Sequence, residues 1–252
     1  MMRYFLHLAY NGKNYFGWQI QPDRPSVQAC LENVFSNLLH EKIGITGAGR
    51  TDTGVHATDF YAHLDTTQDL TTDRKQWLHR INAFLPEDIV VYDILSVRPE
   101  AHARFDALER QYRYTVSYQK NPFVTESAYR IYFKPDMEAM NHCAAMLKEY
   151  RDFTSFSKLH TQTKTNICEI HHAAWREENG LLLFEISANR FLRNMVRAIV
   201  GTLLEVGRHK ITPDAFRALI EAKNRCEAGS SVPAHALCLT HILYPEWLFC
   251  DG

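Results

Sequence analysis

The sequence predicts an α+β fold, and three observations lead to this prediction. Aromatic and aliphatic runs alternate with amphipathic stretches in the order β-α-β-β-α-β over residues 1–98. The same order, with one extra helix, follows over residues 99–252, and no linker rich in proline, glycine or serine separates the halves. Two such halves can join into one large antiparallel sheet with helices on one face, so we expect a single body with a central cleft on the open face.

In the first half, the apolar run 3–10 ends at Asn11-Gly12, which is typical of a turn, and is predicted to be a strand. A helix is expected after Pro25-Ser26, because apolar residues recur from there at helical spacing. Strands flank a glycine-rich loop, the second at about residues 57–64. Thr72 is expected to cap a second helix, and residues 88–97 form the last strand.

In the second half, residues 110–118 alternate strictly between two faces, which is the period of a strand. A hairpin is predicted at Glu178-Asn179-Gly180, and Thr212-Pro213 is typical of a helix start. The remaining elements are expected at residues 136–149 (helix), 167–175 and 181–188 (the hairpin strands), 190–206 (long helix) and 236–244 (strand).

The composition indicates a globular chain: of 252 residues, 46% are hydrophobic, which is enough for a sizeable core. The N-terminus lacks a secretory signal pattern and no run is long enough to span a bilayer, so we expect a cytoplasmic protein without membrane contact. The six cysteines form no C-x-x-C pair and are expected to be buried free thiols. A net charge of −1 means that any nucleic-acid surface must come from local clusters of basic residues.

The stretch Gly47–Ala57 carries three glycines and Thr-Asp-Thr within a few residues, which predicts a tight loop. Arg50 and Asp52 lie two positions apart in this loop, an arrangement that favours an ionised carboxylate able to act as a nucleophile. An ordinary turn between two strands is the competing interpretation.

A second candidate segment is the predicted helix from residue 190. Its apolar residues cover a broad face, and the complementary stripe holds Arg190, Arg193, Asn194, Arg197 and Gly201. Such a stripe is often simply solvated. An enclosed arginine, in contrast, needs an acidic partner, and Asp52 is the candidate partner of Arg197.

Several motifs carry a family resemblance. Gly49-Arg50-Thr51-Asp52-Thr53-Gly54-Val55-His56-Ala57 resembles the signature of the tRNA pseudouridine synthase A family. Further matches span nearly the whole chain: Tyr10-Asn11-Gly12 to Gly17-Trp18-Gln19, residues 102–107, residues 110–114, Asp152 to Phe156, and residues 191–201. One departure is Ala236, which stands where the family tends to have glycine.

The resemblance implies a pseudouridine synthase fold built from two ferredoxin-like halves, residues 1–98 with the catalytic loop and residues 99–252. It implies a homodimer that isomerises uridine at positions 38, 39 and 40 of the tRNA anticodon stem-loop after flipping the base, with no cofactor and no metal. The implied catalytic residues are Asp52, Arg197 and Tyr112. The implied substrate-binding residues include Tyr112, which packs on the target base, and Arg50. Arg104, Arg190 and Arg193 are also expected to bind the RNA.

Three alternatives stay open. Tyr112 could be an ordinary core tyrosine of its strand. The chain could also be an inactive RNA-binding module of the same fold, against which the intact Asp52, Tyr112 and Arg197 argue. A glycosidase or nuclease would need paired carboxylates or a metal cluster, whereas the sequence offers one clear candidate acid.

Overall fold

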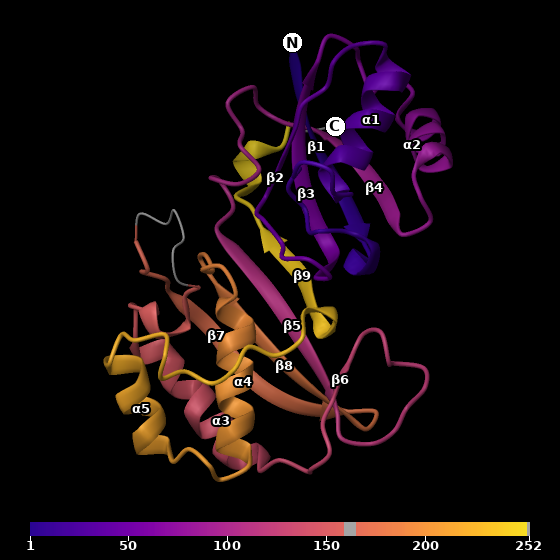
Figure 1. Cartoon of the computed structure of the whole chain (residues 1–252). Coiled ribbons are helices and arrows are strands. Elements are labelled where there is room, and N and C mark those ends of the chain that lie inside the picture. The colour runs from indigo at the N-terminus through magenta and orange to yellow at the C-terminus, as the bar shows by residue number, and fades with distance from the viewer. Residues whose placement is uncertain (159–164, 251–252) are drawn as a thin grey trace. The chain divides into compact units, whose positions relative to one another are not determined.

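The computed structural model of the chain describes residues 1–158 and 165–250. The chain divides into two compact units, one formed by Met1–Leu108 with Leu239–Gly252 and the other by Glu109–Cys238. Each unit contains helices packed on strands, as Figure 1 shows, so the predicted α+β class is confirmed.

The first unit has the predicted element order β-α-β-β-α-β. Its strand β1 runs through the middle of the sheet and is buried along most of its length, with Phe5, Leu6 and Leu8 fully enclosed. The elements are β1 (Met2–Tyr10), α1 (Val27–Leu39), β2 (Ile45–Gly47), β3 (His56–Thr66), α2 (Arg74–Phe84) and β4 (Ile89–Ser96).

In the sheet of this unit the strands follow the order β4-β1-β3, and β1 is antiparallel to both neighbours. The short β2 pairs with the far side of β3 at Ile45–Gly47. Beside β3 also lies β9 (Leu237–Leu243), where the Thr58 hydroxyl donates to the Leu239 carbonyl at 3.5 Å. The end of the chain therefore completes the sheet of the first unit.

The helices of this unit begin for different reasons. The Ser26 hydroxyl accepts a hydrogen bond from the Ala29 amide at 3.3 Å and caps α1, as Pro25-Ser26 predicts. The prediction that Thr72 caps α2 is wrong. Asp73 occupies the cap position without a side-chain hydrogen bond, and the Thr72 hydroxyl donates to Asp69 instead, at 2.5 Å.

The second unit has three antiparallel strands in the order β5-β8-β7, with α3, α4 and α5 beside one another in Figure 1. A two-residue strand, β6, pairs parallel to β5; it was not predicted, because two residues show no period. The elements are β5 (Glu109–Ser117), β6 (Tyr129–Arg130), α3 (Met137–Met146), β7 (Ile170–Glu178), β8 (Leu181–Ala188), α4 (Met195–Gly207) and α5 (Pro213–Glu221).

The hairpin between β7 and β8 turns at Asn179 and Gly180, with φ angles of 53° and 75°. Both values are left-handed, as a two-residue type I′ turn requires, so the turn predicted from Asn-Gly is confirmed. The predicted helix start at Thr212-Pro213 is also confirmed, since the Thr212 hydroxyl accepts from the Ala215 amide at 3.2 Å.

Two predicted helices have different limits in the structure. The helix expected over 136–149 ends at Met146 and continues as a single 3₁₀ turn, Leu147–Glu149. The helix expected from Arg190 begins only at Met195, because Asn194 has a φ of 66° and no α-helix passes through a left-handed residue. Arg190 and Arg193 therefore lie in the segment before α4 rather than on it.

All six cysteines are free thiols, as predicted, but their burial differs. Cys143 and Cys168 are buried, and burial raises the pKa of the Cys168 thiol to about 11. Cys226 and Cys250 are exposed, so the prediction of burial is wrong for these two. Both lie in irregular segments near the surface, where local apolar composition says little about burial.

Candidate active site

The loop between β2 and β3 holds Asp52 at the first position of a tight turn. The Val55 amide donates to the Asp52 carbonyl at 3.1 Å, and Gly54 has a φ of 80° at the third position of this turn. A left-handed third residue is what a type II turn requires, and glycine adopts it without strain. The side chain of Asp52 belongs to a half-buried residue between the buried Thr51 and the exposed Thr53.

The segment Tyr10–Trp18 packs directly against this loop. The Trp18 amide donates to the Thr51 carbonyl at 3.4 Å, and the Gly54 amide donates to the Tyr15 carbonyl at 3.3 Å. A buried hydrogen bond of 2.9 Å joins the Tyr10 phenol to the Thr51 hydroxyl. These bonds fix the backbone on both sides of Asp52.

Two glycines make this close packing possible. A Cβ atom on Gly17 would lie 2.2 Å from the Thr51 carbonyl oxygen, and one on Gly12 would lie 2.0 Å from the Val55 carbonyl oxygen. Gly17 also has a left-handed φ of 88°. The first motif of the chain, from Tyr10 to Gln19, therefore serves as the support on which the second motif, the Asp52 loop, rests.

Arg50 and Arg104 both border a pocket of about 90 Å³ beside this loop. Both residues are exposed, so their charged groups can reach a ligand in solvent. The floor includes Trp18, whose ring stacks on Phe60 at 4.3 Å between centroids. The residues that line the pocket are Trp18, Gln19, Gln28, Ile45, Thr46, Gly47, Gly49, Arg50 and Arg104.

The turn that carries Arg104 is held by two histidines. His102 Nδ1 accepts from the Arg104 amide at 3.1 Å, and His63 Nδ1 accepts from the Ala103 amide at 3.1 Å. Burial, together with the nearby Arg3 charge, lowers the pKa of His63 to about 4, and burial also lowers the pKa of His102. A low pKa keeps the His63 imidazole neutral, which an acceptor nitrogen requires.

In the second unit, Tyr112 lies on β5 opposite Ile186 of β8 and is half-buried. Its ring meets Phe191 edge-on, with centroids 5.2 Å apart and an interplanar angle of 89°. Tyr114, two residues along the strand, is fully buried and donates to the Pro233 carbonyl at 2.9 Å. Burial raises the pKa of Tyr114. Tyr114 is thus a core residue of β5, whereas Tyr112 keeps a partly exposed ring.

Arg197 lies on α4 and is bound to the segment that follows α5. Its Nε donates to the Val232 carbonyl at 2.7 Å, and the Val232 amide donates back to the Arg197 carbonyl at 3.2 Å. One turn further, a Cβ atom on Gly201 would lie 2.0 Å from the Ser230 carbonyl oxygen. The polar face of this helix therefore packs against residues 230–232 and holds the Arg197 side chain in one orientation.

Arg190 and Arg193 precede this helix. Arg190 is half-buried and Arg193 is exposed, and the Arg193 carbonyl accepts from the Lys158 amide at 3.2 Å. The predicted stripe of arginines along one helix is thus wrong in its geometry, because only Arg197 of the three is helical.

Within each unit, the structure brings together part of the predicted set. Arg50 and Arg104 share a pocket, and the loop of Asp52 is in the same unit. Tyr112, Arg190, Arg193 and Arg197 belong to the other unit. The ion pair of Asp52 with Arg197 would join residues of different units and stays a prediction.

Four contributors to the site were not assigned a role from the sequence: Trp18, His63, His102 and Val232. Trp18 stood within a family motif, which could have indicated its place beside the loop. His63 and Val232 gave no signal, because their roles depend on contacts made far along the chain.

Among the residues that the structure describes, no three His, Cys, Asp or Glu side chains lie close enough together to hold a metal ion. Within the same residues, no helix has the length and apolar character needed to cross a membrane.

Comparison with known proteins decides the family. A relative from Neisseria meningitidis serogroup B, "tRNA pseudouridine synthase A", is 38% identical over 247 residues, which is 97% of this chain and 92% of the relative. The protein of the same name from Parabacteroides distasonis is 54% identical over 249 residues, 99% of this chain and 98% of the relative. The chain belongs to the tRNA pseudouridine synthase A family. Members of this family are isomerases that convert uridine to pseudouridine.

Two further comparisons agree with this assignment to the tRNA pseudouridine synthase A family. The relative from Bacteroides thetaiotaomicron, with the same name, is 52% identical over 254 residues, covering 100% of this chain and 94% of the relative. The sequence profile described as "tRNA pseudouridine synthase" matches residues 145–245, a stretch that includes Arg190, Arg193 and Arg197.

Proposed function

We propose that this chain converts uridine to pseudouridine at positions 38, 39 and 40 of the tRNA anticodon stem-loop. The observation that supports this most strongly is the fixed turn at Asp52, held on both sides by hydrogen bonds to Tyr10, Tyr15 and Trp18. A rigid backbone that presents one half-buried carboxylate suits a nucleophile that must meet its target in a single orientation. The reaction consumes no electron, phosphate or group donor, so the proposal includes no cofactor and no metal.

The first step is to bring the base within reach. A uridine stacked in an RNA helix is inaccessible, so it must flip out into the protein at a cost of a few kcal/mol. Arg50 is exposed at the edge of the pocket that it shares with Arg104, and both can hold phosphates near the flipped nucleotide. In this proposal Arg50 also offsets the lost stacking.

Asp52 then acts on the flipped nucleotide. It attacks C1′ of the ribose or C6 of the base, or removes a ribose proton in a glycal route, and the bond from N1 to C1′ breaks. The uracil turns over and C5 joins C1′. As this happens, Asp52 is displaced from C1′, or it leaves C6, or the ribose regains its proton in the glycal route. C5 finally loses its proton and N1 gains one, so that the product is an isomer of the substrate. In this proposal Arg197 keeps Asp52 ionised and oriented, and Tyr112 packs on the uracil and helps to remove the C5 proton.

The wider proposal concerns the assembly. Arg190 and Arg193 contact the RNA backbone, and a homodimer in the cytoplasm binds the tRNA across both subunits. The two halves 1–98 and 99–252 are ferredoxin-like and form one catalytic body with a joint antiparallel sheet and a central cleft. The strand order β4-β1-β3, with β2 on the far side of β3, supports this for the first half.

The test uses unmodified tRNA without added metal or nucleotide, with pseudouridine mapped by chemical labelling. Asp52→Asn should abolish product while tRNA binding changes by only a few fold, because the carboxylate is lost but its shape is kept. Asp73→Asn, at an exposed position of the same unit, is the control and should retain full activity. Turnover of Asp52→Asn above about 1% of the wild type would remove Asp52 from the nucleophile role.

Tyr112 is tested separately by Tyr112→Phe, which keeps the ring that meets Phe191 and removes only the hydroxyl. The late proton removal should then be slow in single-turnover experiments. An unchanged single-turnover rate would return Tyr112 to a packing role.

A further inference from the structure

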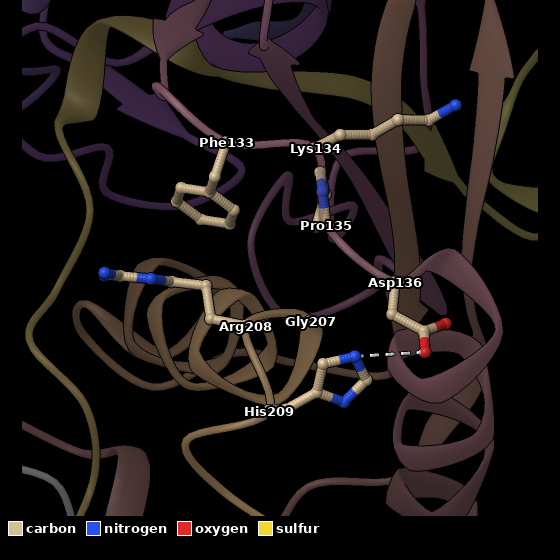
Figure 2. Close-up of a pocket in the computed structure, with 7 residues that line it drawn as sticks. All are labelled: Phe133, Lys134, Pro135, Asp136, Gly207, Arg208 and His209. Atoms are coloured by element: carbon tan, nitrogen blue, oxygen red, sulfur yellow. Dashed lines mark ion pairs between the residues drawn. The ribbon is translucent and has the colours of Figure 1, made fainter.

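A second pocket, of about 450 Å³, lies in the unit Glu109–Cys238, where the chain enters α3 and leaves α4. Figure 2 shows its lining, which comes from residues 133–136 and 207–209. We refer to it as the basic pocket. None of these residues has a role in the isomerisation proposed above, so the basic pocket is distinct from the candidate active site.

Close backbone packing gives the basic pocket its shape. The Asp136 amide donates to the Gly207 carbonyl at 2.9 Å, which joins the two segments. A Cβ atom on Gly207 would lie 2.8 Å from both Met140 Sδ and Pro135 Cβ. After this glycine the chain turns sharply, with a left-handed φ of 59° at His209. Buried contacts therefore hold together the two backbone segments from which the lining side chains project.

An arginine and an aromatic ring face one another on one side of the basic pocket, as Figure 2 shows. The Arg208 guanidinium carbon lies 4.8 Å from the centre of the Phe133 ring. One of its terminal nitrogens also donates to Glu205 at 3.2 Å. Stacking on Phe133 occupies the flat face of the guanidinium and leaves other N–H groups at its edge for an acceptor in solvent.

The carboxylate in the lining is already engaged. Asp136 caps α3 by accepting from the Ala139 amide at 3.0 Å, and its other oxygen lies 3.5 Å from His209 Nε2. Lys134 also borders the pocket and is exposed, with no ion pair to any residue within 1–158 and 165–250. Figure 2 shows its side chain pointing away from Phe133 and Arg208. The lining therefore offers positive charge outward, from Lys134 and Arg208.

The same arrangement recurs immediately before the basic pocket in the sequence. Tyr132 is 83% exposed, and the Arg130 guanidinium carbon lies 4.8 Å from the centre of its ring. An arginine guanidinium is thus stacked on the ring of each of two consecutive aromatic residues, Tyr132 and Phe133. Surfaces that bind RNA typically combine basic side chains, which contact phosphates, with aromatic rings and guanidinium planes, on which bases stack.

We infer that the basic pocket, formed by Phe133, Lys134, Asp136, Arg208 and His209, binds the phosphodiester backbone of the tRNA substrate. Charge complementarity supports RNA as the occupant, since the protein as a whole has a net charge of −1 while this lining presents two permanent cations to solvent. An acidic protein surface would use the cations but not the aromatic rings of Tyr132 and Phe133. This inference rests on the proposed function, because tRNA is the RNA considered.

The experiment measures the Kd of the full chain for unmodified tRNA at several salt concentrations. The variant Lys134→Gln with Arg208→Gln removes both cations. It should weaken binding about tenfold and reduce the slope of log K against log salt by about 1 to 2, which is the loss expected for two phosphate contacts. At saturating tRNA, the rate of pseudouridine formation should stay within about twofold of the wild type.

The matched control is Arg217→Gln with Lys223→Gln, two cations of the same unit outside the pocket, which pair with Glu149 and Asp152 as Arg208 pairs with Glu205. It removes the same charge and should leave the Kd and the salt slope within about twofold of the wild type. Equal weakening by both double variants would mean that general charge attracts the RNA, and it would overturn the pocket as a site.

A third variant, Phe133→Leu, retains the charges and removes the stacked ring. It should weaken binding several fold with an unchanged salt slope. An unchanged Kd in the Lys134→Gln, Arg208→Gln variant, with circular dichroism as for the wild type, would contradict the inference. The inference would also be contradicted if the Lys134→Gln, Arg208→Gln variant lost as much affinity for inorganic phosphate as for tRNA, since the pocket would then be a site for the free ion.

The two proposals fail in different ways. If wild-type protein binds tRNA through the basic pocket but forms no pseudouridine, the proposed function is wrong and the site stands. If Asp52-dependent pseudouridine formation is observed and the Lys134→Gln, Arg208→Gln variant binds as the wild type does, the site is wrong and the function stands.

Discussion

The Tyr10 phenol and the Thr51 hydroxyl form a buried hydrogen bond of 2.9 Å, immediately before Asp52 in the chain. Tyr10 is the last residue of β1, so this bond links the end of a central strand to the loop that carries the candidate nucleophile. Both partners are polar groups removed from water, which makes the loss of either one costly.

Tyr10→Phe should therefore lower stability and activity together. The Thr51 hydroxyl would stay buried without its partner, at a cost of about 1–3 kcal/mol in the free energy of unfolding. The turnover number should fall because the Asp52 backbone is held less firmly. Urea unfolding and single-turnover assays measure the two effects. Tyr92→Phe, at a tyrosine that is 51% exposed, is the control and should change neither quantity.

Gly17→Ala should be far more harmful than Gly180→Ala. Both glycines have left-handed φ angles, 88° and 75°, so alanine costs about 1 kcal/mol of backbone strain at either. Only at Gly17 does the new Cβ also meet the Thr51 carbonyl oxygen, at 2.2 Å, whereas nothing lies within 4 Å at Gly180. Denaturant unfolding of both variants should separate the steric cost from the strain, and equal losses would contradict the close approach.

The stability of the protein should depend on pH through His63. Burial, and then Arg3, lower its folded-state pKa to about 4 from the ordinary 6.5. Between these values the unfolded chain binds a proton at this residue that the folded chain does not. Stability should therefore fall as the pH is lowered from 6.5 toward 4, by at most about 3 kcal/mol, and this contribution is absent above 6.5.

The measurement compares wild type with His63→Asn by urea unfolding at about pH 7 and pH 4.5. Asparagine can still accept from the Ala103 amide but binds no proton, so its stability should fall less between the two conditions. His79→Asn, at an exposed position on α2, is the control. Equal pH dependence in wild type and His63→Asn would show that His63 does not titrate in this range.

Arg197→Lys tests whether a fixed guanidinium is needed. Lysine keeps the charge but has no Nε–H in the position that donates to the Val232 carbonyl, so the charge is no longer held in one orientation. The turnover number should fall by at least tenfold while the Kd for tRNA stays within about threefold. Arg217→Lys, at an arginine on α5 whose side chain is 44% exposed, is the control. Full activity of Arg197→Lys would contradict the proposed role.

Much of the fold could be predicted from the sequence because its signals are local. The alternation in β5, the Asn179-Gly180 turn and the Ser26 and Thr212 caps depend on residues a few positions apart. The start of α4 could not be predicted, because Phe191 and Leu192 continue the apolar spacing of the helix although Asn194 interrupts it with a left-handed φ.

The candidate site shows the same division. The glycine-rich loop around Asp52 and its tight turn could be predicted from composition alone. The bond from Arg197 to Val232 joins residues 35 positions apart, and that from His63 to Ala103 joins residues 40 apart. No local pattern encodes such partners, because they depend on how separate elements pack.

The position of β9 has a consequence for biosynthesis. The strand that lies beside β3 comes from the C-terminal part of the chain, and the whole segment Glu109–Cys238 is translated between the two. While the ribosome makes that segment, the β3 backbone near Thr58 and Asp59 has no strand on that side, and unpaired edges of this kind promote aggregation. The nascent first unit therefore keeps an unpaired edge on β3 until Leu239 is synthesised.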